Sequence, residues 1–280
     1  MLVSIVRFGV LPLLVGCSVG GPEARPDPTY QAYAVRYGTL RGFPLRGLVL
    51  GADSTERVDL AMTVWMLRGQ DRVVLVDAGF YRDEFLASWE VEDFVRPSEA
   101  IARFGVRPEE VTDIVISHMH WDHVDGADLF PNARVWIQQA EYEHYGDSTN
   151  LPRSGVFASD VAMLREIERA GRLHLVPGDS SEIAPGIVAF TGGRHTHESQ
   201  YVSARLEGGA TAVFASDNLY LYANLERQRP IAATWDTVSN LAAQDRMRRL
   251  ASNERLIVPG HDLAVFARFP DAGPGAVRIH

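Results

Sequence analysis

Residues 117–123 read SHMHWDH and directly follow the run DIVI, so three histidines and one aspartate fall within six positions. In an extended segment alternate side chains share a face, so the imidazoles of His118 and His120 can reach one ion. Asp122 and His123 follow where the strand must turn, which can aim them at a second ion nearby. Imidazole and carboxylate ligands suit Zn²⁺, and also Fe or Mn. The motif therefore predicts a metal site at the end of a buried strand, and a loop of surface polar residues is the alternative.

Short apolar runs alternate with amphipathic stretches along the rest of the chain. Period-two patterns predict strands and 3.6-residue periodicity predicts helices. The expected strands span residues 30–37, 47–50, 59–68, 72–76, 109–117, 135–138, 173–176, 186–191, 200–206, 211–215 and 255–258. The expected helices span residues 97–104, 139–145, 159–171 and 237–251. Strands in a meander, followed by strands mixed with helices, favour an α/β fold with two mixed sheets flanked by helices, an αββα sandwich.

The first residues, MLVSIVRFGVLPLLVGCS, have the proportions of an export signal, with Arg7 ahead of an apolar stretch too short to span a bilayer. Residues 14–17, LVGC, resemble the lipobox of bacterial lipoproteins, in which the cysteine becomes the lipidated first residue. We therefore expect a signal peptide at residues 1–16, a Gly/Pro-rich tether at 17–29 and one catalytic domain at 30–280. We therefore expect an exported protein, which lipidated Cys17 holds on the membrane surface of the bacterial cell envelope. The alternatives are an ordinary cleaved signal, giving a periplasmic or secreted protein, and an N-terminal strand.

The charge balance argues against nucleic-acid binding. The chain has 27 Lys and Arg against 36 Asp and Glu, a formal net charge of −9, and no cation-rich run. Neutralising phosphates requires clustered cations. Cys17 is the chain's single cysteine, so no thiolate in the body of the chain can bind a metal or attack a substrate.

Residues 118–123, HMHWDH, resemble the signature of the metallo-β-lactamase superfamily. Four other segments resemble motifs of that family and occur in the family's order. They are VLVDAG at 74–79, TGGRHT at 191–196, VFASD at 213–217 and VPGHD at 258–262. The resemblance covers most of the chain after the tether and implies the αββα metallo-β-lactamase fold.

The same resemblance implies a site for two divalent metal ions, with Zn²⁺ expected and Fe, Co or Mn as alternatives. Its expected ligands are His118, His120 and His195 for the first ion, Asp122, His123 and His261 for the second, and Asp217 as a bridge. Asp77 is expected to orient one of the ligands. Arg194 stands where the family usually has Gly, and His197 lies two residues beyond His195, so His197 is the alternative ligand.

The spacing Asp217-x-x-Tyr220 is similar to that of the quorum-quenching N-acyl homoserine lactonases, in which a tyrosine helps to hold the substrate carbonyl. Residues three apart on a helix share a face, so Tyr220 is expected to face the site. Packing of Tyr220 between helix and sheet is the alternative. The absence of any cysteine other than Cys17 excludes the β-lactamases that use a Cys ligand. The β-lactamases with an all-His/Asp second site have no bridging aspartate, whereas this chain has Asp217 at that position.

These features together predict a hydrolase of a small-molecule ester or lactone. The resemblance implies that a hydroxide shared by two metal ions attacks the carbonyl, Tyr220 stabilises the oxyanion and Asp122 carries a proton to the leaving group. The alternatives are a β-lactamase, another ester or thioester hydrolase of the fold, a mononuclear iron dioxygenase, and a lipoprotein that binds metal or ligand without turnover. Acyl-chain preference and oligomeric state are left open.

Overall fold

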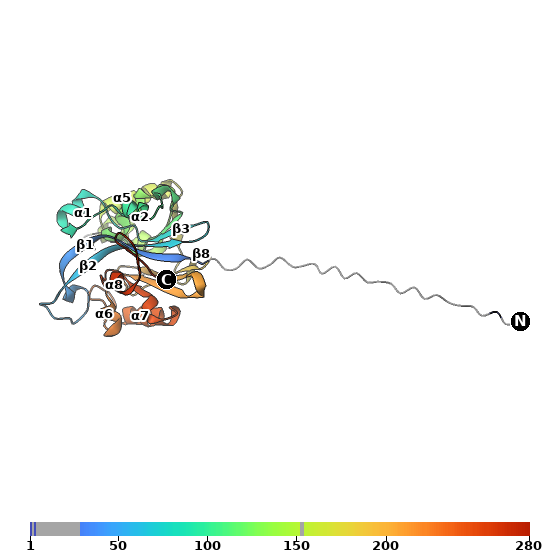
Figure 1. Ribbon diagram of the computed structural model, residues 1–280. Helices are drawn as coiled ribbons and strands as arrows, with labels where there is room; N and C mark the ends of the chain where they lie inside the picture. The colour runs from blue at the N-terminus through green and yellow to red at the C-terminus, as the bar shows by residue number, and fades with distance from the viewer. Residues whose placement is uncertain (2, 4–28, 152–153) are drawn as a thin grey trace.

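The computed structural model describes residues 1, 3, 29–151 and 154–280, and its strands form two sheets packed face to face (Figure 1). Cys17 and nearly all of the predicted signal and tether lie outside the described residues, so both stay predictions. Among the described helices, none combines the length and the apolar character needed to cross a membrane.

The larger sheet has nine strands within the described part of the chain. Their order is β13 (Asp271–Gly273), β14 (Ala276–Arg278), β1 (Gln31–Pro44), β2 (Arg57–Arg68), β3 (Val73–Val76), β5 (Asp113–Val115), β6 (Arg134–Gln138) and β7 (Leu173–Val176), with β4 (Val91–Glu92) paired to β1. β1 and β2 are antiparallel, whereas β3, β5, β6 and β7 run parallel. Parallel strands end at one edge of a sheet, so the loops after β3 and β5 leave it side by side.

The smaller sheet has five strands among the described residues. Their order is β12 (Ile257–Pro259), β11 (Thr211–Ser216), β10 (Gln200–Arg205), β9 (Ile187–Thr191) and β8 (Ser181–Ala184). β11 and β12 are parallel neighbours, so Asp217 and His261, which follow them, lie at the same edge.

Helices cover the outer faces of the two sheets, with α1, α2 and α5 on one side and α6 and α7 on the other (Figure 1). The helices are α1 (Asp83–Ser88), α2 (Pro97–Ala102), α3 (Trp121–Val124), α4 (Gln139–Gly146), α5 (Ala158–Arg169), α6 (Tyr222–Glu226), α7 (Thr237–Leu250) and α8 (Val265–Arg268). The predicted αββα sandwich is confirmed.

The strand β3 illustrates why the central strands are apolar at every position. Val74 and Val76 belong to the core between the two sheets, whereas Leu75 belongs to the core under the helices. Side chains alternate across a strand, and both faces of this strand are buried, so neither face needs polar residues.

The strand expected at residues 47–50 is wrong. The segment contains a 3₁₀ turn, Leu45–Gly47, followed by a tight turn, and only Val49 forms a single bridge to Ile231. Leu48 and Val49 pack in a small core with Leu60 and Tyr220 instead of in a sheet, and Leu50 is exposed. Tertiary packing therefore accounts for the apolar pattern. The strands β8, β13 and β14 and the helix α1 were not expected.

Asp160, in the first turn of α5, is fully buried, and neither carboxylate oxygen has a hydrogen-bond partner among the described residues. Arg82 Nη1 lies 3.6 Å from Asp160 Oδ1. Burial raises the pKa of Asp160 to about 7, and the Arg82 charge opposes that rise.

The folded state therefore holds the Asp160 proton more tightly than the unfolded state, whose carboxyl titrates near ~3.9. This contribution to stability is largest below pH ~4 and is lost as the pH rises towards 7. We expect Asp160→Asn to remove that loss. At pH 8 the free energy of unfolding of the variant should therefore exceed that of the wild type by up to about 4 kcal/mol. Urea unfolding of both metal-free proteins at pH 5 and pH 8 measures this, and an identical pH dependence in the two would contradict it.

Candidate metal centre

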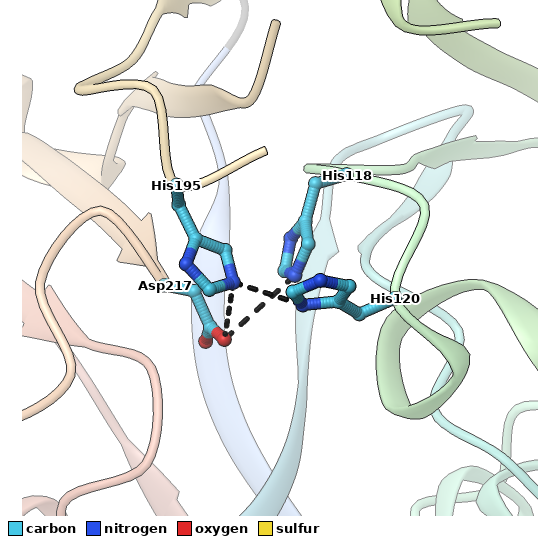
Figure 2. Close-up of side chains that lie close together, drawn as sticks. All are labelled: His118, His120, His195 and Asp217. Atoms are coloured by element: carbon cyan, nitrogen blue, oxygen red, sulfur yellow. Dashed lines mark hydrogen bonds and ion pairs between the residues drawn. The ribbon is translucent and has the colours of Figure 1, made fainter. Parts of the chain in front are cut away.

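Loops from both sheets bring seven histidine and aspartate side chains together at the shared edge. The first group is His118, His120, His195 and Asp217, and the second group is Asp122, His123 and His261. Within each group the candidate ligand atoms lie within 4.8 Å of one another. In Figure 2 the rings of His118 and His120 face His195 and Asp217 across a common space.

Asp217 lies between the two groups and presents a different oxygen to each. Its Oδ2 is 3.3 Å from His195 Nε2 and 3.7 Å from His118 Nε2. Its Oδ1 is 2.9 Å from His261 Nε2 and 3.4 Å from His123 Nε2. A carboxylate in this position can contact two cations at once.

The second group is built from the short helix α3 and the loop after β12. Asp122 and His123 lie in the first turns of α3, which begins directly after His120. Asp122 Oδ2 is 3.5 Å from His123 Nε2 and 3.7 Å from His261 Nε2. The chain thus turns from an extended segment into a helix between the two groups, which separates their ligands as the motif predicted.

Each histidine of the two groups has one ring nitrogen within hydrogen-bond distance of an atom outside the groups. The pairs are His118 Nδ1 with Ser117 Oγ (2.8 Å), His120 Nε2 with Ser154 O (2.9 Å), His123 Nδ1 with Asp77 Oδ2 (2.8 Å), His195 Nδ1 with Ala233 O (2.7 Å) and His261 Nδ1 with Ala61 O (3.1 Å). A carbonyl or carboxylate acceptor fixes a proton on that nitrogen, so the other nitrogen faces inward, where it can bind either a proton or a metal ion.

Two of the inward nitrogens lack a protein group to pair with, which suits a metal ion. His118 Nε2 and His123 Nε2 are buried and have no hydrogen-bond partner among the described residues. Buried polar atoms are normally paired. A set of imidazole nitrogens and carboxylate oxygens around two small spaces matches the donors that Zn²⁺ and related ions prefer.

Burial controls the charge of the first group. It lowers the pKa of His118 well below its usual value and that of His120 to about 3, and neighbouring imidazoles add to both shifts. Both rings are neutral at pH 7, which is the form that binds metal. Burial disfavours the charged form of Asp217, but His123 and His261 outweigh it and hold the pKa of that carboxyl well below its usual range.

Three carboxylates, from Asp122, Asp217 and Asp77, lie close to His123 of the second group. Burial lowers the pKa of His123, but Asp122, Asp217 and Asp77 outweigh it and raise that pKa well above its usual value. The same balance of burial against carboxylates raises the pKa of His261. A proton or a metal ion can supply the positive charge that this arrangement favours, so metal uptake here releases protons.

A largely apolar cavity of about 280 Å³ opens beside the two groups. His120, Asp122, Asp217, Tyr220 and His261 form part of its wall. The remaining wall includes the apolar residues Leu40, Phe43, Leu60, Met62, Trp89 and Trp121. The rings of Trp89 and Trp121 stack with centroids 5.8 Å apart at 18°.

A family model described as the metallo-β-lactamase superfamily matches residues 59–261, a stretch that contains all seven residues of the two groups. The chain belongs to the metallo-β-lactamase superfamily. Within it, curated N-acyl homoserine lactonases are among the relatives. One from a Bacillus species is 25% identical over 224 residues, covering 74% of this chain and 84% of that protein. One from Agrobacterium fabrum is 23% identical over 235 residues, covering 76% and 84%.

Solved structures of the superfamily share the fold. A quorum-quenching N-acyl homoserine lactone lactonase superposes with a TM-score of 0.70 at 22% identity, covering 85% of this chain and 95% of that one. AidC, a dizinc quorum-quenching lactonase with a bound product, superposes with a TM-score of 0.64 at 13% identity. The superposition covers 90% of this chain and 97% of AidC.

Of the two alternative ligands, His195 lies with His118 and His120 in the first group, whereas His197 does not. His197 stacks on His144 instead, with ring centroids 3.9 Å apart. Tyr220 lines the cavity as expected, but not from a helix, because α6 begins only at Tyr222. A turn after β11 directs Tyr220, so the helical argument for its position is wrong.

Behind the ligands lies a network in which Asp77 was expected to orient a ligand, and it contacts His123 at 2.8 Å, whereas the two serines of the network were missed by the motifs. Ser216 Oγ is 2.8 Å from both Asp77 Oδ2 and Ser117 Oγ, which connects His118 to His123 through hydroxyl and carboxylate groups. Asp77 and Ser216 have left-handed backbones, with φ of 61° and 46°. Such conformations are costly outside glycine and concentrate at functional sites. Serine is common beside strands, so its sequence position carried no signal.

Proposed function

We propose that this protein is a dinuclear metal-dependent hydrolase that opens N-acyl homoserine lactones. The observation that carries the proposal is Asp217, whose two oxygens face two different histidine groups beside an apolar cavity. The curated relatives named as N-acyl homoserine lactonases support the substrate class.

The residues that would hold the ions are His118, His120 and His195 for one, Asp122, His123 and His261 for the other, with Asp217 shared. We propose Zn²⁺, with Fe, Co or Mn as alternatives for the same donors. When bound, such a pair of ions lowers the pKa of a shared water and polarises a carbonyl oxygen.

Asp122 is placed to carry a proton during the reaction. It lines the cavity, and its side chain keeps 16% of its surface exposed. Burial raises its pKa, but His123 and His261 outweigh burial and lower it overall, so the group is a carboxylate at neutral pH. A carboxylate there can accept the proton of the hydroxyl group that adds to the carbonyl carbon and pass it to the leaving oxygen.

Tyr220 is placed to donate to the substrate carbonyl. Burial raises the pKa of its hydroxyl well above the usual value, so the proton stays on the oxygen. The hydroxyl lies 3.3 Å from His195 Nδ1, but that nitrogen donates to Ala233 O at 2.7 Å. The Tyr220 proton therefore has no acceptor at His195 and is available to an oxyanion in the cavity.

Tyr220→Phe is expected to lower kcat about 10–100-fold, the order of one lost donor, while the metal content stays unchanged. Tyr222→Phe is the matched control, because its buried hydroxyl has no hydrogen-bond partner among the described residues and does not line the cavity. Steady-state lactone hydrolysis by both variants measures the difference. Equal activity in Tyr220→Phe and wild type would leave Tyr220 with a packing role only.

The cavity favours a small ligand with an apolar portion. Its volume of about 280 Å³ lies just below the range typical of ligand pockets, ~300–1,000 Å³. Phe43, Trp89 and Trp121 present aromatic surface beside the polar groups. We propose that short acyl chains are preferred.

The test of the function follows acid release in weakly buffered solution, with zinc-loaded protein and homoserine lactones of short and long acyl chains. Metal-dependent release that is lost in Asp122→Asn would support a lactonase. Absence of release from any lactone would overturn the substrate assignment, and β-lactams and aryl esters would be assayed next.

We also propose, from the lipobox-like residues 14–17, that the enzyme is exported and held on the cell envelope through Cys17. This would place it where extracellular lactones travel. Incorporation of labelled palmitate into the wild type but not into Cys17→Ser would support the anchor, and equal labelling would exclude it.

A further inference from the structure

A carboxylate outside both ligand groups joins loops that carry the first group. Glu141, in the first turn of α4, is fully buried. Its Oε1 accepts the N–H of Met119 at 3.0 Å, and its Oε2 accepts the N–H of Glu198 at 2.7 Å. Met119 lies between His118 and His120, so one end of this contact fixes the backbone that presents both rings.

The two amides belong to loops from different sheets. The Met119 loop follows β5 of the larger sheet, whereas Glu198 lies between β9 and β10 of the smaller sheet, three residues after His195. A single side chain therefore bridges the two loops that supply the histidines of the first group. Hydrogen bonds from amides to a carboxylate are short and strong, which suits a fixed spacing.

We propose that Glu141 is a positioning residue, which holds His118 and His120 at the distance from His195 that an ion in the first group requires. This inference rests on the proposed metal-binding function. Metal–ligand distances must be met within about 0.2 Å, so a small shift between the loops weakens binding. Asp122, His123 and His261 lie on α3 and after β12, outside the contact, so their affinity for metal depends little on Glu141.

Glu141→Gln keeps the shape of the side chain but places an amide nitrogen against one of the two N–H donors. The fold has a second link at the same place, because Gln138 Nε2 donates to Gln200 Oε1 at 2.9 Å and Gln200 N donates to Ser117 O at 2.8 Å. We therefore expect the variant to fold. Glu143→Gln, on the exposed face of α4, is the matched control.

Zinc affinity is measured by chelator competition in two backgrounds. In His261→Ala the first group is intact, and there Glu141→Gln is expected to weaken zinc binding about 10–100-fold. In His120→Ala the second group is intact, and there the change is expected to stay below about 3-fold, within the usual additivity of distant sites. Glu143→Gln is expected to leave the zinc affinity unchanged in both backgrounds. Equal weakening in both backgrounds, or none in either, would overturn the positioning role.

Amide hydrogen exchange in the metal-free wild type provides a test that does not depend on a variant. The amides of Met119 and Glu198 are expected to be as strongly protected as the strand amides of β5 and β10. Rapid exchange at both would overturn the inference. Failure of the wild type to bind zinc would overturn the metal assignment and this inference with it, whereas zinc binding that ignores Glu141→Gln would overturn the positioning role alone.

Discussion

Asp217→Asn is expected to reduce lactone hydrolysis by at least about 100-fold and to reduce the affinity for both ions. The reason is geometric, because the two oxygens of this carboxylate lie 3.3 Å and 2.9 Å from His195 Nε2 and His261 Nε2, one in each group. Asparagine keeps the size of the side chain but loses its charge and offers a donor in place of one acceptor. Metal analysis after dialysis and initial rates of acid release measure both effects.

Asp245→Asn, which removes an exposed carboxylate on α7, is the control for the loss of one charge. It is expected to leave rate and metal content unchanged. An Asp217→Asn variant that retained two ions and at least a tenth of the activity would show that the carboxylate is not shared. The outcome therefore separates a bridging role from a role in one group alone.

Asp77→Ala is expected to cost about 3–5 kcal/mol of stability in the metal-free protein. The fully buried Asp77 carboxylate is within hydrogen-bond distance of Ser117 N at 2.7 Å, Ser216 Oγ at 2.8 Å and His123 Nδ1 at 2.8 Å. Alanine leaves these groups unpaired. Alanine is also less favourable at φ 61°, a left-handed conformation that Asp and Asn tolerate best among residues other than glycine.

Asp77→Asn separates the loss of charge from these two causes, because asparagine keeps the tolerance of the left-handed backbone and one acceptor oxygen. We expect it to be clearly less destabilised than Asp77→Ala in urea unfolding. Asp71→Ala, which changes an exposed residue shortly before β3, is the control. Its free energy of unfolding is expected to be within about 0.5 kcal/mol of the wild-type value. Equal losses in Asp77→Asn and Asp77→Ala would mean that charge alone is responsible.

The metal centre could be anticipated because its ligand types are rare in apolar surroundings and recur at fixed spacings. The pattern H-x-H-x-D-H after a buried strand separates the two groups as the structure does, with α3 beginning directly after His120. The sandwich followed from the order of the elements, with strands in a meander first and strands mixed with helices after them. These features depend on local sequence and on burial, which a single sequence expresses directly.

Other features depend on contacts that local sequence does not express. The apolar residues at 47–50 match a strand, but Leu48 and Val49 pack in the small core with Tyr220 and Leu50 is exposed. Tyr220 reaches the cavity through a turn, although its spacing suggested a helix. Glu141 is an ordinary residue in an acidic helical stretch, and only the meeting of two distant loops gives its carboxylate a role.

The division of the ligands between the two sheets also links metal binding to folding. His118 and His120 come from the earlier half of the chain, and His195 and Asp217 from the later half. An ion held by all four is a reversible cross-link that closes only after both halves have docked. Free ion at a hundred times its Kd adds about 2.7 kcal/mol to the free energy of unfolding. Scarcity of metal would therefore lower the free energy of unfolding, and the supply of ions would set what share of the protein stays folded.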